Sequence, residues 1–213
     1  MAGLYDATWG RFFAAMYDRM LADTEEAGMR RNRAELLARA SGRTLELGAG
    51  TGLNLEHYPA AVTELVLTEP FEPMARQLRE RAAGDPRGAE VVGASASALP
   101  FEDSSFDTVV ATLVLCTVDD PAAALAEVGR VLRPGGEFLF CEHVRSREPG
   151  LARWQDRLER PWHFVGHGCH PNRDTVATIA ASPLELGEVR DERLPKSPPI
   201  VRPLAIGSAR RPA

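Results

Sequence analysis

The residues best suited to hold a ligand form a glycine-rich run, Glu-Leu-Gly-Ala-Gly-Thr-Gly, at positions 46–52. Glycines at 48, 50 and 52 allow a tight turn and let backbone N–H groups approach a ligand with no Cβ in the way. A dinucleotide-binding loop would place its last glycine at position 53, which is Leu53. The carboxylate of Glu46 beside the loop suits a ligand with an ammonium or sulfonium charge and would repel a pyrophosphate. The run therefore favours a positively charged ligand over NAD.

A second acid, Glu69, stands downstream of the loop, at the end of the next predicted strand. A carboxylate at that place can accept two hydrogen bonds from ribose hydroxyls, as it does in nucleotide-binding βαβ units. The alternative is that Glu46 and Glu69 are solvated strand ends and that the glycines make an ordinary turn. Because the glycines and both acids occur in the order that such units require, the sequence favours nucleoside binding.

The elements that must position these residues alternate between strands and helices. Apolar runs predict strands, and apolar residues at steps of three and four predict helices, of which the one opened by Pro121 is the best marked. We expect two helices over 4–40, further helices over 53–58, 72–83 and 121–132, and strands over 43–47, 64–68, 91–92, 108–116, 137–141, 184–194 and 204–209. Residues 145–181 are less regular. Strands separated by helices indicate a parallel sheet, here closed by a hairpin of the last two strands.

Size and charge limit the class of protein. The 213 residues suit one domain, and a net charge of −5 argues against a general nucleic-acid-binding surface, which needs a basic face. Three widely spaced cysteines, Cys116, Cys141 and Cys169, fit a reducing cytoplasm better than a disulfide framework. Charged residues interrupt the first twenty positions, and no apolar stretch approaches the ~20 residues that span a bilayer. We therefore expect a soluble cytoplasmic protein and leave a peripheral membrane contact open.

Four motifs together resemble one enzyme family. They are Glu46-x-Gly48-x-Gly50-x-Gly52 followed by Glu69, Ser-Ala-Ser-Ala-Leu-Pro-Phe at 95–101, Ser-Phe-Asp at 105–107 and Leu-Arg-Pro-Gly-Gly at 132–136. The set, which covers about residues 43–145, resembles class I S-adenosylmethionine-dependent methyltransferases of the small-molecule type. Val-Leu-Cys at 114–116, Glu-His-Val at 142–144, Trp162 and Gly-Cys-His at 168–170 resemble more narrowly the branch with the membrane-associated mammalian alkyl thiol S-methyltransferases. Phospholipid and quinone methyltransferases are more distant relatives with the same loop pattern.

The resemblance implies a Rossmann-like, doubly wound α/β fold with a mostly parallel seven-stranded sheet. A helical cap would span 1–42 and a single S-adenosylmethionine-binding domain 43–213. It assigns Gly48, Ala49 and Gly50 to the methionine part of the cofactor, Glu46 to its amino group, Glu69 to the ribose, and Ser95 and Ala96 to the adenine side. Gly52, Pro70 and Thr112 are further expected cofactor contacts. Many relatives have an aspartate where this chain has Ser95, and a hydroxyl accepts a hydrogen bond more weakly than a carboxylate.

Methyl transfer needs alignment, a dry pocket and, for some acceptors, a base, because the cofactor carries the electrophile. In open parallel sheets that pocket lies beyond the carboxyl ends of the strands. His143 is the candidate general base, since imidazole titrates near neutral pH and could deprotonate a thiol or hydroxyl, although it could instead orient a loop. Cys116 either borders the transferred methyl group or packs as a small hydrophobe.

Aromatic, histidine and cysteine side chains crowd into residues 162–170. The spacing of His163, His167 and Cys169 invites a zinc interpretation. Glycines interrupt the helix there, a paired cysteine motif is absent and methyl transfer needs no metal, so we expect none. We expect a wall of the substrate pocket instead, with Trp162 for apolar contact and His170 for a polar one.

An aromatic stripe near the N-terminus consists of Trp9, Phe12, Phe13, Met16 and Tyr17. It indicates a packed helical lid, or else a helix that covers the substrate or enters a membrane interface. Taken together, the sequence predicts a methyltransferase for a small apolar acceptor, with a thiol as first choice and a phospholipid or quinone as the alternative. Outside this class the alternatives are an NAD-dependent oxidoreductase and a catalytically silent cofactor-binding module. The oligomeric state stays open.

Overall fold

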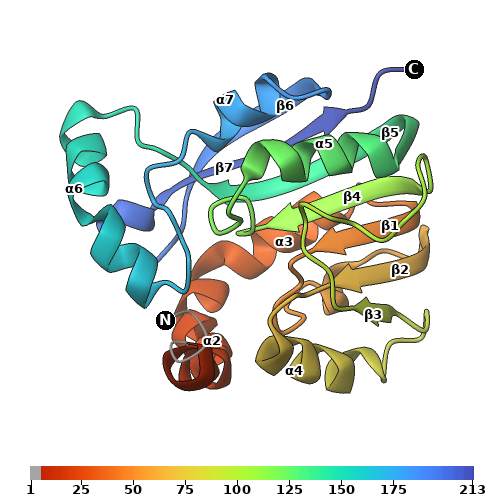
Figure 1. The fold of residues 1–213 in the computed structure, drawn as a ribbon, viewed down its shortest axis with the longest axis horizontal. Coiled ribbons are helices and arrows are strands. Elements are labelled where there is room, and N and C mark those ends of the chain that lie inside the picture. The colour runs from red at the N-terminus through yellow and green to blue at the C-terminus, as the bar shows by residue number, and fades with distance from the viewer. Residues whose placement is uncertain (1–5) are drawn as a thin grey trace.

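The computed structural model describes residues 6–213, and a single seven-stranded sheet forms its centre (Figure 1). The strands are β1 (Gly42–Leu47), β2 (Val62–Thr68), β3 (Glu90–Val92), β4 (Phe106–Thr112), β5 (Leu132–His143), β6 (Glu185–Arg193) and β7 (Pro203–Arg210). Their order is β3-β2-β1-β4-β5-β7-β6, with β1 to β5 parallel and β7 antiparallel to both of its neighbours. The predicted doubly wound, mostly parallel seven-stranded sheet is confirmed.

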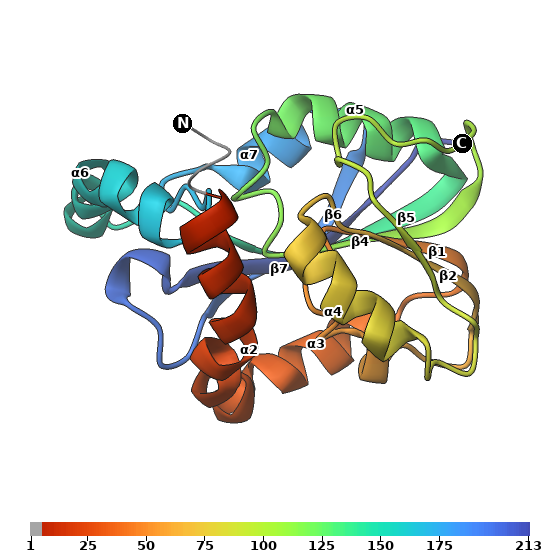
Figure 2. The same cartoon turned by 60° about the horizontal axis from the view of Figure 1, so that its bottom comes forward.

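Helices cover both faces of this sheet (Figure 2). On one face lie α5 (Pro121–Val131) and α7 (Thr175–Ala180), and on the other α3 (Arg30–Leu37) and α4 (Glu72–Ala82). Two further helices, α2 (Arg11–Thr24) and α6 (Pro149–Val165), stand beyond the carboxyl ends of the parallel strands (Figure 1). Short helical turns cover Asp6–Gly10, Glu25–Met29, Leu55–His57 and Pro199–Val201. The carboxyl edge of the sheet is therefore enclosed by α2 and α6.

The central strands β1, β2, β4 and β5 are buried on both faces over much of their length, which explains why they read as apolar runs in the sequence. In β1, Leu45 and Leu47 pack into the core under α5. Glu46 lies between them and, because side chains alternate along a strand, points to the face covered by α3 and α4. There it meets Tyr58 and Asn54, so this face carries a buried polar network beside its apolar core.

The N-terminal helices are joined to that network. A turn at Glu25–Met29 connects α2 to α3, and Gly28 supplies the positive φ of 146° that bends the chain there. Arg33 of α3 donates to Glu25 at 3.0 Å and to Asn54 at 2.8 Å, and all three side chains are buried. The helical pattern expected from residue 4 is observed from residue 6, while residues 4 and 5 lie outside the described part of the chain.

Three sequence expectations about these elements are wrong. The helix expected over 53–58 is a single 3₁₀ turn, because Tyr58 precedes Pro59 and adopts an extended conformation. The strand expected to reach Cys116 ends at Thr112, and Leu113 turns the chain with a φ of 59°. The less regular region contains α6, a helix of 17 residues that continues through Pro161, a residue that usually ends or kinks a helix.

Glu142 of β5 supports the turn that follows β4. Its side chain is fully buried, and its carboxylate accepts the backbone N–H groups of Val114 at 2.8 Å, Leu115 at 3.0 Å and Cys116 at 3.3 Å. Burial raises the pKa of Glu142 to about 7, although these hydrogen bonds favour the charged form. The turn lies against the end of the sheet, where N–H groups without an acceptor would be costly.

We therefore predict that Glu142→Ala lowers the free energy of unfolding by about 2–4 kcal/mol, because three buried N–H groups lose their acceptor. Denaturant unfolding followed by circular dichroism measures the change. The control is Glu188→Ala on the exposed part of β6, which should shift stability by less than about 0.5 kcal/mol. Equal midpoints for the two variants would show that the turn does not depend on Glu142.

Candidate functional site

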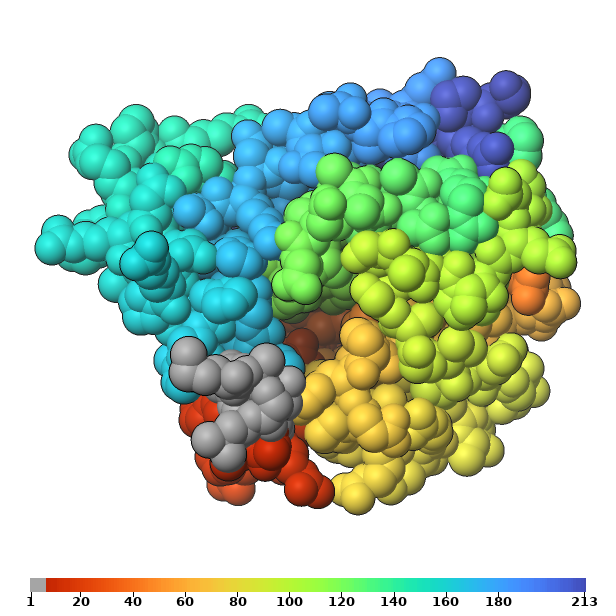
Figure 3. All heavy atoms as spheres, viewed as in Figure 1, coloured from red at the N-terminus to blue at the C-terminus, as the bar shows by residue number. Residues whose placement is uncertain are grey.

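A cavity of about 550 Å³ opens at the carboxyl ends of β1, β2, β4 and β5. Figure 3 shows a hollow on this face of the molecule, between the segments coloured yellow, green and cyan. Each of the four strands contributes lining residues where it ends, namely Gly48 and Gly50 after β1, Glu69 and Pro70 after β2, Thr112 in β4 and His143 in β5. The position agrees with the general rule that ligands of open parallel sheets bind beyond the carboxyl ends of the strands.

The glycine loop adopts a conformation that favours glycine. Gly48 and Gly50 have φ values of 52° and 58°. A Cβ on Gly48 would come within 3.0 Å of both methyl groups of Val114, so a side chain there would collide with the turn after β4. Around Gly50 the nearest atom to such a Cβ is the sulfur of Met74, at 4.0 Å. At Gly50 the loop therefore exposes its backbone to the cavity, and at Gly48 it packs against Val114.

Glu46, Ala49 and Gly52 do not line the cavity among the described residues, which departs from the roles expected for them. The Glu46 carboxylate is buried and accepts from Tyr58 Oη at 2.6 Å and Asn54 Nδ2 at 2.9 Å. Burial raises its pKa to about 7, and the two hydrogen bonds oppose that shift. Ala49 is buried in the core, and Gly52 packs closely against the side chains of Leu55 and Leu78. These three residues hold the loop from behind.

Glu69 lines the cavity and is held in place by backbone. Its two carboxylate oxygens accept the N–H groups of Gly50 at 2.9 Å and Phe71 at 2.8 Å. Burial raises the pKa of Glu69, while these two hydrogen bonds lower it. A carboxylate offers about four acceptor positions, so two remain for a pair of hydroxyl groups from the cavity side.

The adenine-side candidates also reach the cavity. Ser95 and Ala96 both line it, and Ser95 lies exposed at its rim with its hydroxyl 3.4 Å from that of Ser97. Thr112 accepts a hydrogen bond from Asn54 at 3.1 Å, which ties the end of β4 to the polar network behind the loop.

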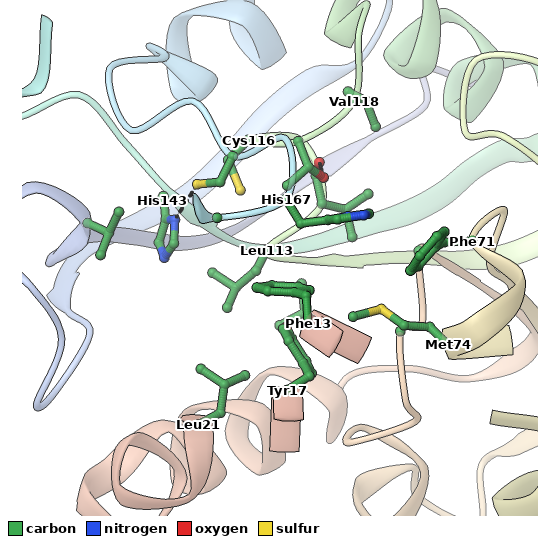
Figure 4. Close-up of a pocket in the computed structure, with 18 of the residues that line it drawn as sticks. Phe13, Tyr17, Leu21, Phe71, Met74, Leu113, Cys116, Val118, His143 and His167 are labelled. Carbon is green, nitrogen blue, oxygen red and sulfur yellow. Dashed lines mark hydrogen bonds between the residues drawn. The ribbon is translucent and has the colours of Figure 1, made fainter. Parts of the chain in front are cut away.

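The helix α2 covers the cavity and is fixed to the sheet through polar contacts. Phe13 and Tyr17 line the cavity, and the ring of Phe13 stacks on that of His167 with centroids 5.2 Å apart (Figure 4). Asp18 accepts from the hydroxyl of Thr51 in the glycine loop at 2.5 Å and pairs with Arg81 of α4. The aromatic stripe of the sequence therefore forms a lid whose inner face is Phe13 and Tyr17.

The far end of the cavity brings together Cys116, His143 and Cys169, of which Figure 4 labels the first two. The sulfur of Cys169 lies 3.4 Å from Nδ1 of His143. The hydrogen bond from the Cys116 thiol, with His143 beside it, lowers the pKa of Cys169 well below its usual range, against the effect of burial. Nε2 of His143 is buried and has no hydrogen-bond partner among the described residues. Trp162 closes this end, which is otherwise apolar.

His170 does not line the cavity among the described residues, contrary to its expected role as a substrate contact. Its Nδ1 lies 2.7 Å from Glu159, and its ring packs on His163 at 4.4 Å, on the outer side of α6. The histidine of this segment that lines the cavity is His167, beside Phe71. Sequence reasoning missed Phe71 and Cys169 as cavity residues, because no local pattern shows that these segments meet.

Comparison with known proteins agrees with this geometry. The family described as "Methyltransferase domain" matches residues 45–140. The chain is 35% identical to "Thiol S-methyltransferase TMT1B" of Homo sapiens over 178 residues, which cover 80% of this chain and 70% of the relative. The corresponding protein of Rattus norvegicus is also 35% identical, over 76% of this chain and 66% of its own length, so the chain spans about two thirds of these relatives.

Two further likenesses are broader. "Phosphatidylethanolamine N-methyltransferase" of Cereibacter sphaeroides is 35% identical over 70% of this chain and 76% of its own length. A solved structure from Thermotoga maritima, titled a SAM-dependent methyltransferase and possible histamine N-methyltransferase, superposes with a TM-score of 0.68 at 22% identity, covering 95% of this chain and 98% of that one. This last likeness supports the fold, and the curated relatives support the family.

The geometry at Glu69 leads to a binding prediction. Glu69→Ala should weaken the affinity for S-adenosylhomocysteine by about 1–3 kcal/mol, roughly tenfold to a hundredfold in Kd, because charge-assisted hydrogen bonds to ribose hydroxyls are lost. Isothermal titration calorimetry measures the change. Glu72→Ala is the matched control, since Glu72 opens the neighbouring helix, is exposed and pairs with Arg79 outside the cavity. A Kd that stays the same in Glu69→Ala would remove the ribose role from this residue.

Proposed function

Because this chain belongs to the class I S-adenosylmethionine-dependent methyltransferases, we propose that it transfers a methyl group to the sulfur of a small apolar thiol. The observation that carries the proposal is that one cavity has two chemically different ends. Glu69 and the glycine loop form a polar end, while His143 lies among buried thiols and apolar side chains at the other. The likeness to curated thiol S-methyltransferases supports sulfur as the acceptor atom.

The residues present fit the cofactor. Gly50 leaves its backbone open to the cavity, Glu69 keeps free acceptor positions for the ribose, and Ser95 and Ala96 lie on the adenine side. When bound, S-adenosylmethionine supplies an electrophilic methyl group on a sulfonium centre. Phe13 and Tyr17 of α2 line the cavity with aromatic surface, which reduces the contact of a bound ligand with water and so strengthens its polar contacts.

His143 is the residue that we propose to act on the acceptor. Its Nδ1 faces Cys169, while the buried Nε2 lacks a hydrogen-bond partner among the described residues and can receive a proton from an acceptor thiol. The neighbouring carboxylate of Glu142 is taken up by backbone N–H groups, so it supports the turn and not the reaction. The net charge of −5 further supports a small-molecule acceptor over a nucleic acid.

A lipid acceptor is the second candidate. Several large apolar side chains of α2 and α6 are exposed, namely Phe12, Met20, Trp154, Phe164 and Val165. Between residues 6 and 213 no helix is long and apolar enough to cross a membrane. The exposed residues therefore support a peripheral contact with a lipid surface, from which a phospholipid or quinone could reach the cavity. The three unpaired, buried cysteines support a reducing compartment such as the cytoplasm.

An acceptor comparison tests the choice of substrate. The purified protein is offered S-adenosylmethionine with an alkyl thiol, the amine and the alcohol of the same chain length, phosphatidylethanolamine vesicles and a reduced quinone, and release of S-adenosylhomocysteine is measured. We expect the thiol to be turned over at least tenfold faster than its amine and alcohol analogues. Faster turnover of the lipid or quinone would favour the second candidate. No turnover with any acceptor would make the chain a silent cofactor-binding module.

We also predict that His143→Ala lowers kcat by about 10²–10⁴-fold, while the Kd of S-adenosylhomocysteine stays nearly unchanged. Raising the pH should partly restore the variant, because a thiol with a pKa of about 8.5 ionises without a base. His170→Ala is the control, since His170 pairs with Glu159 away from the cavity and its loss should leave turnover intact. Normal turnover in His143→Ala would leave alignment and desolvation as the only catalytic devices, and a lost cofactor affinity would place His143 at the cofactor.

A further inference from the structure

Three side chains of the type that binds transition metals meet at the far end of the cavity. Cys116 comes from the turn after β4 and His143 ends β5 (Figure 4), while Cys169 follows α6. One potential ligand atom from each residue lies within 4.8 Å of the other two, and all three residues are buried. These three potential metal ligands differ from the set suggested by sequence spacing, His163, His167 and Cys169. Only Cys169 belongs to both sets.

The donors and their spacing suit a zinc ion. Zinc in proteins binds cysteine sulfur at about 2.3 Å and histidine nitrogen at about 2.0 Å in a tetrahedron, which places the donors roughly 3.3–3.8 Å apart. The 3.4 Å between Cys169 Sγ and His143 Nδ1 lies in that range. Two cysteines and one histidine are also a ligand set of catalytic zinc sites, which leave the fourth position open for water or substrate.

We propose that Cys116, His143 and Cys169 bind a zinc ion whose fourth position opens on the cavity and receives the sulfur of the acceptor. The identity of that acceptor rests on the proposed function, whereas the binding of the ion does not. Two thiolates neutralise the charge of Zn²⁺, which makes the ion compatible with burial. All three ligands belong to residues that line the cavity, so the ion and the acceptor share one space.

Hydrogen bonds to the backbone hold the two cysteine segments in place. Glu142 accepts the N–H of Cys116, and the N–H of His170 donates to the carbonyl of Cys116 at 2.8 Å, which joins the two cysteine segments. The guanidinium of Arg173 donates to the carbonyls of Leu115 and Val118. Arg173 interacts electrostatically with both cysteines, but its hydrogen bonds and those of Glu142 go to backbone atoms, so both sulfurs can still bind an ion directly.

Cys141 shows that burial alone does not make such a site. It is as deeply buried as Cys116, but it lies in the apolar core on the face of α3 and α4 and takes no part in the clusters of potential ligands. It belongs to β5, two residues before His143. The chain therefore contains its own matched control for any experiment on cysteine ligands.

The ion would change how the acceptor loses its proton. As the acceptor sulfur binds the ion, its S–H bond breaks, the proton passes to water and the electron pair stays on sulfur as a metal-bound thiolate. No electron is transferred and no further reactant is needed. In this arrangement Nδ1 of His143 is a ligand and Nε2 carries the hydrogen, so the ion takes over from His143 the role of promoting loss of the acceptor's proton.

Metal content tests the proposal without any methyl acceptor. The protein is purified under reducing conditions from cells supplied with zinc, and its metal is measured by mass spectrometry. We expect roughly one zinc ion per chain in the wild type and in Cys141→Ser, and at least a tenfold loss in Cys116→Ser and Cys169→Ser. Replacing zinc by cobalt should produce a thiolate-to-metal absorption band in the wild type and in Cys141→Ser. The band should be absent in Cys116→Ser and Cys169→Ser.

Several results would overturn the proposal. One is a folded, fully reduced wild type that takes up neither zinc nor cobalt. Another is a double variant, Cys116→Ser/Cys169→Ser, that still retains zinc. A disulfide between these two cysteines in protein purified without reductant and resistant to mild reduction would replace the metal by a covalent link. Should a cysteine variant fail to fold by circular dichroism, His143→Gln with intact cysteines carries the test. Thiol turnover by a metal-free protein would contradict the zinc site but would still support the proposed function.

Discussion

The turn after β4 lies inside the molecule, where its backbone N–H groups need hydrogen-bond acceptors, and the Glu142 carboxylate provides them. Three consecutive N–H groups, from Val114 to Cys116, donate to this one buried side chain of the neighbouring strand. The turn that results places Val114 under Gly48 and Cys116 beside His143 and Cys169. Both ends of the cavity therefore depend on a charge that the protein buries at a cost in solvation.

The same arrangement separates two kinds of chemistry within one cavity. Toward β1 and β2, backbone N–H groups and the carboxylate of Glu69 make a polar surface suited to a nucleoside. Toward β5, thiols, an imidazole and Trp162 make a surface suited to a soft, apolar acceptor. The helix α2 covers both ends of the cavity. The hydrogen bond from Thr51 to Asp18 joins this helix to the glycine loop, so the cofactor end and the lid are in direct contact.

Local sequence patterns could predict most of the sheet, the glycine loop and the positions of Glu69 and His143, because strand ends in a parallel sheet meet at one edge. They could not predict that Cys169 joins Cys116, since that meeting depends on how α6 returns the chain to the sheet. The inward turn of Glu46 was foreseeable from strand alternation, yet its partners Tyr58 and Asn54 come from a segment expected to be helical. His170 was misplaced because it lies in the non-helical segment after α6, where the side chain of its neighbour Cys169 lines the cavity and its own contacts Glu159.

The central claim is that cofactor and acceptor share this one cavity, with the cofactor at the Glu69 end. A crystal structure of the protein with S-adenosylhomocysteine tests it most directly. The account predicts ribose hydroxyls at the carboxylate of Glu69, the adenine beside Ser95 and the sulfur facing the end that holds Cys116, His143 and Cys169. A ligand bound outside the cavity, or one whose sulfur faces away from His143, would contradict the account.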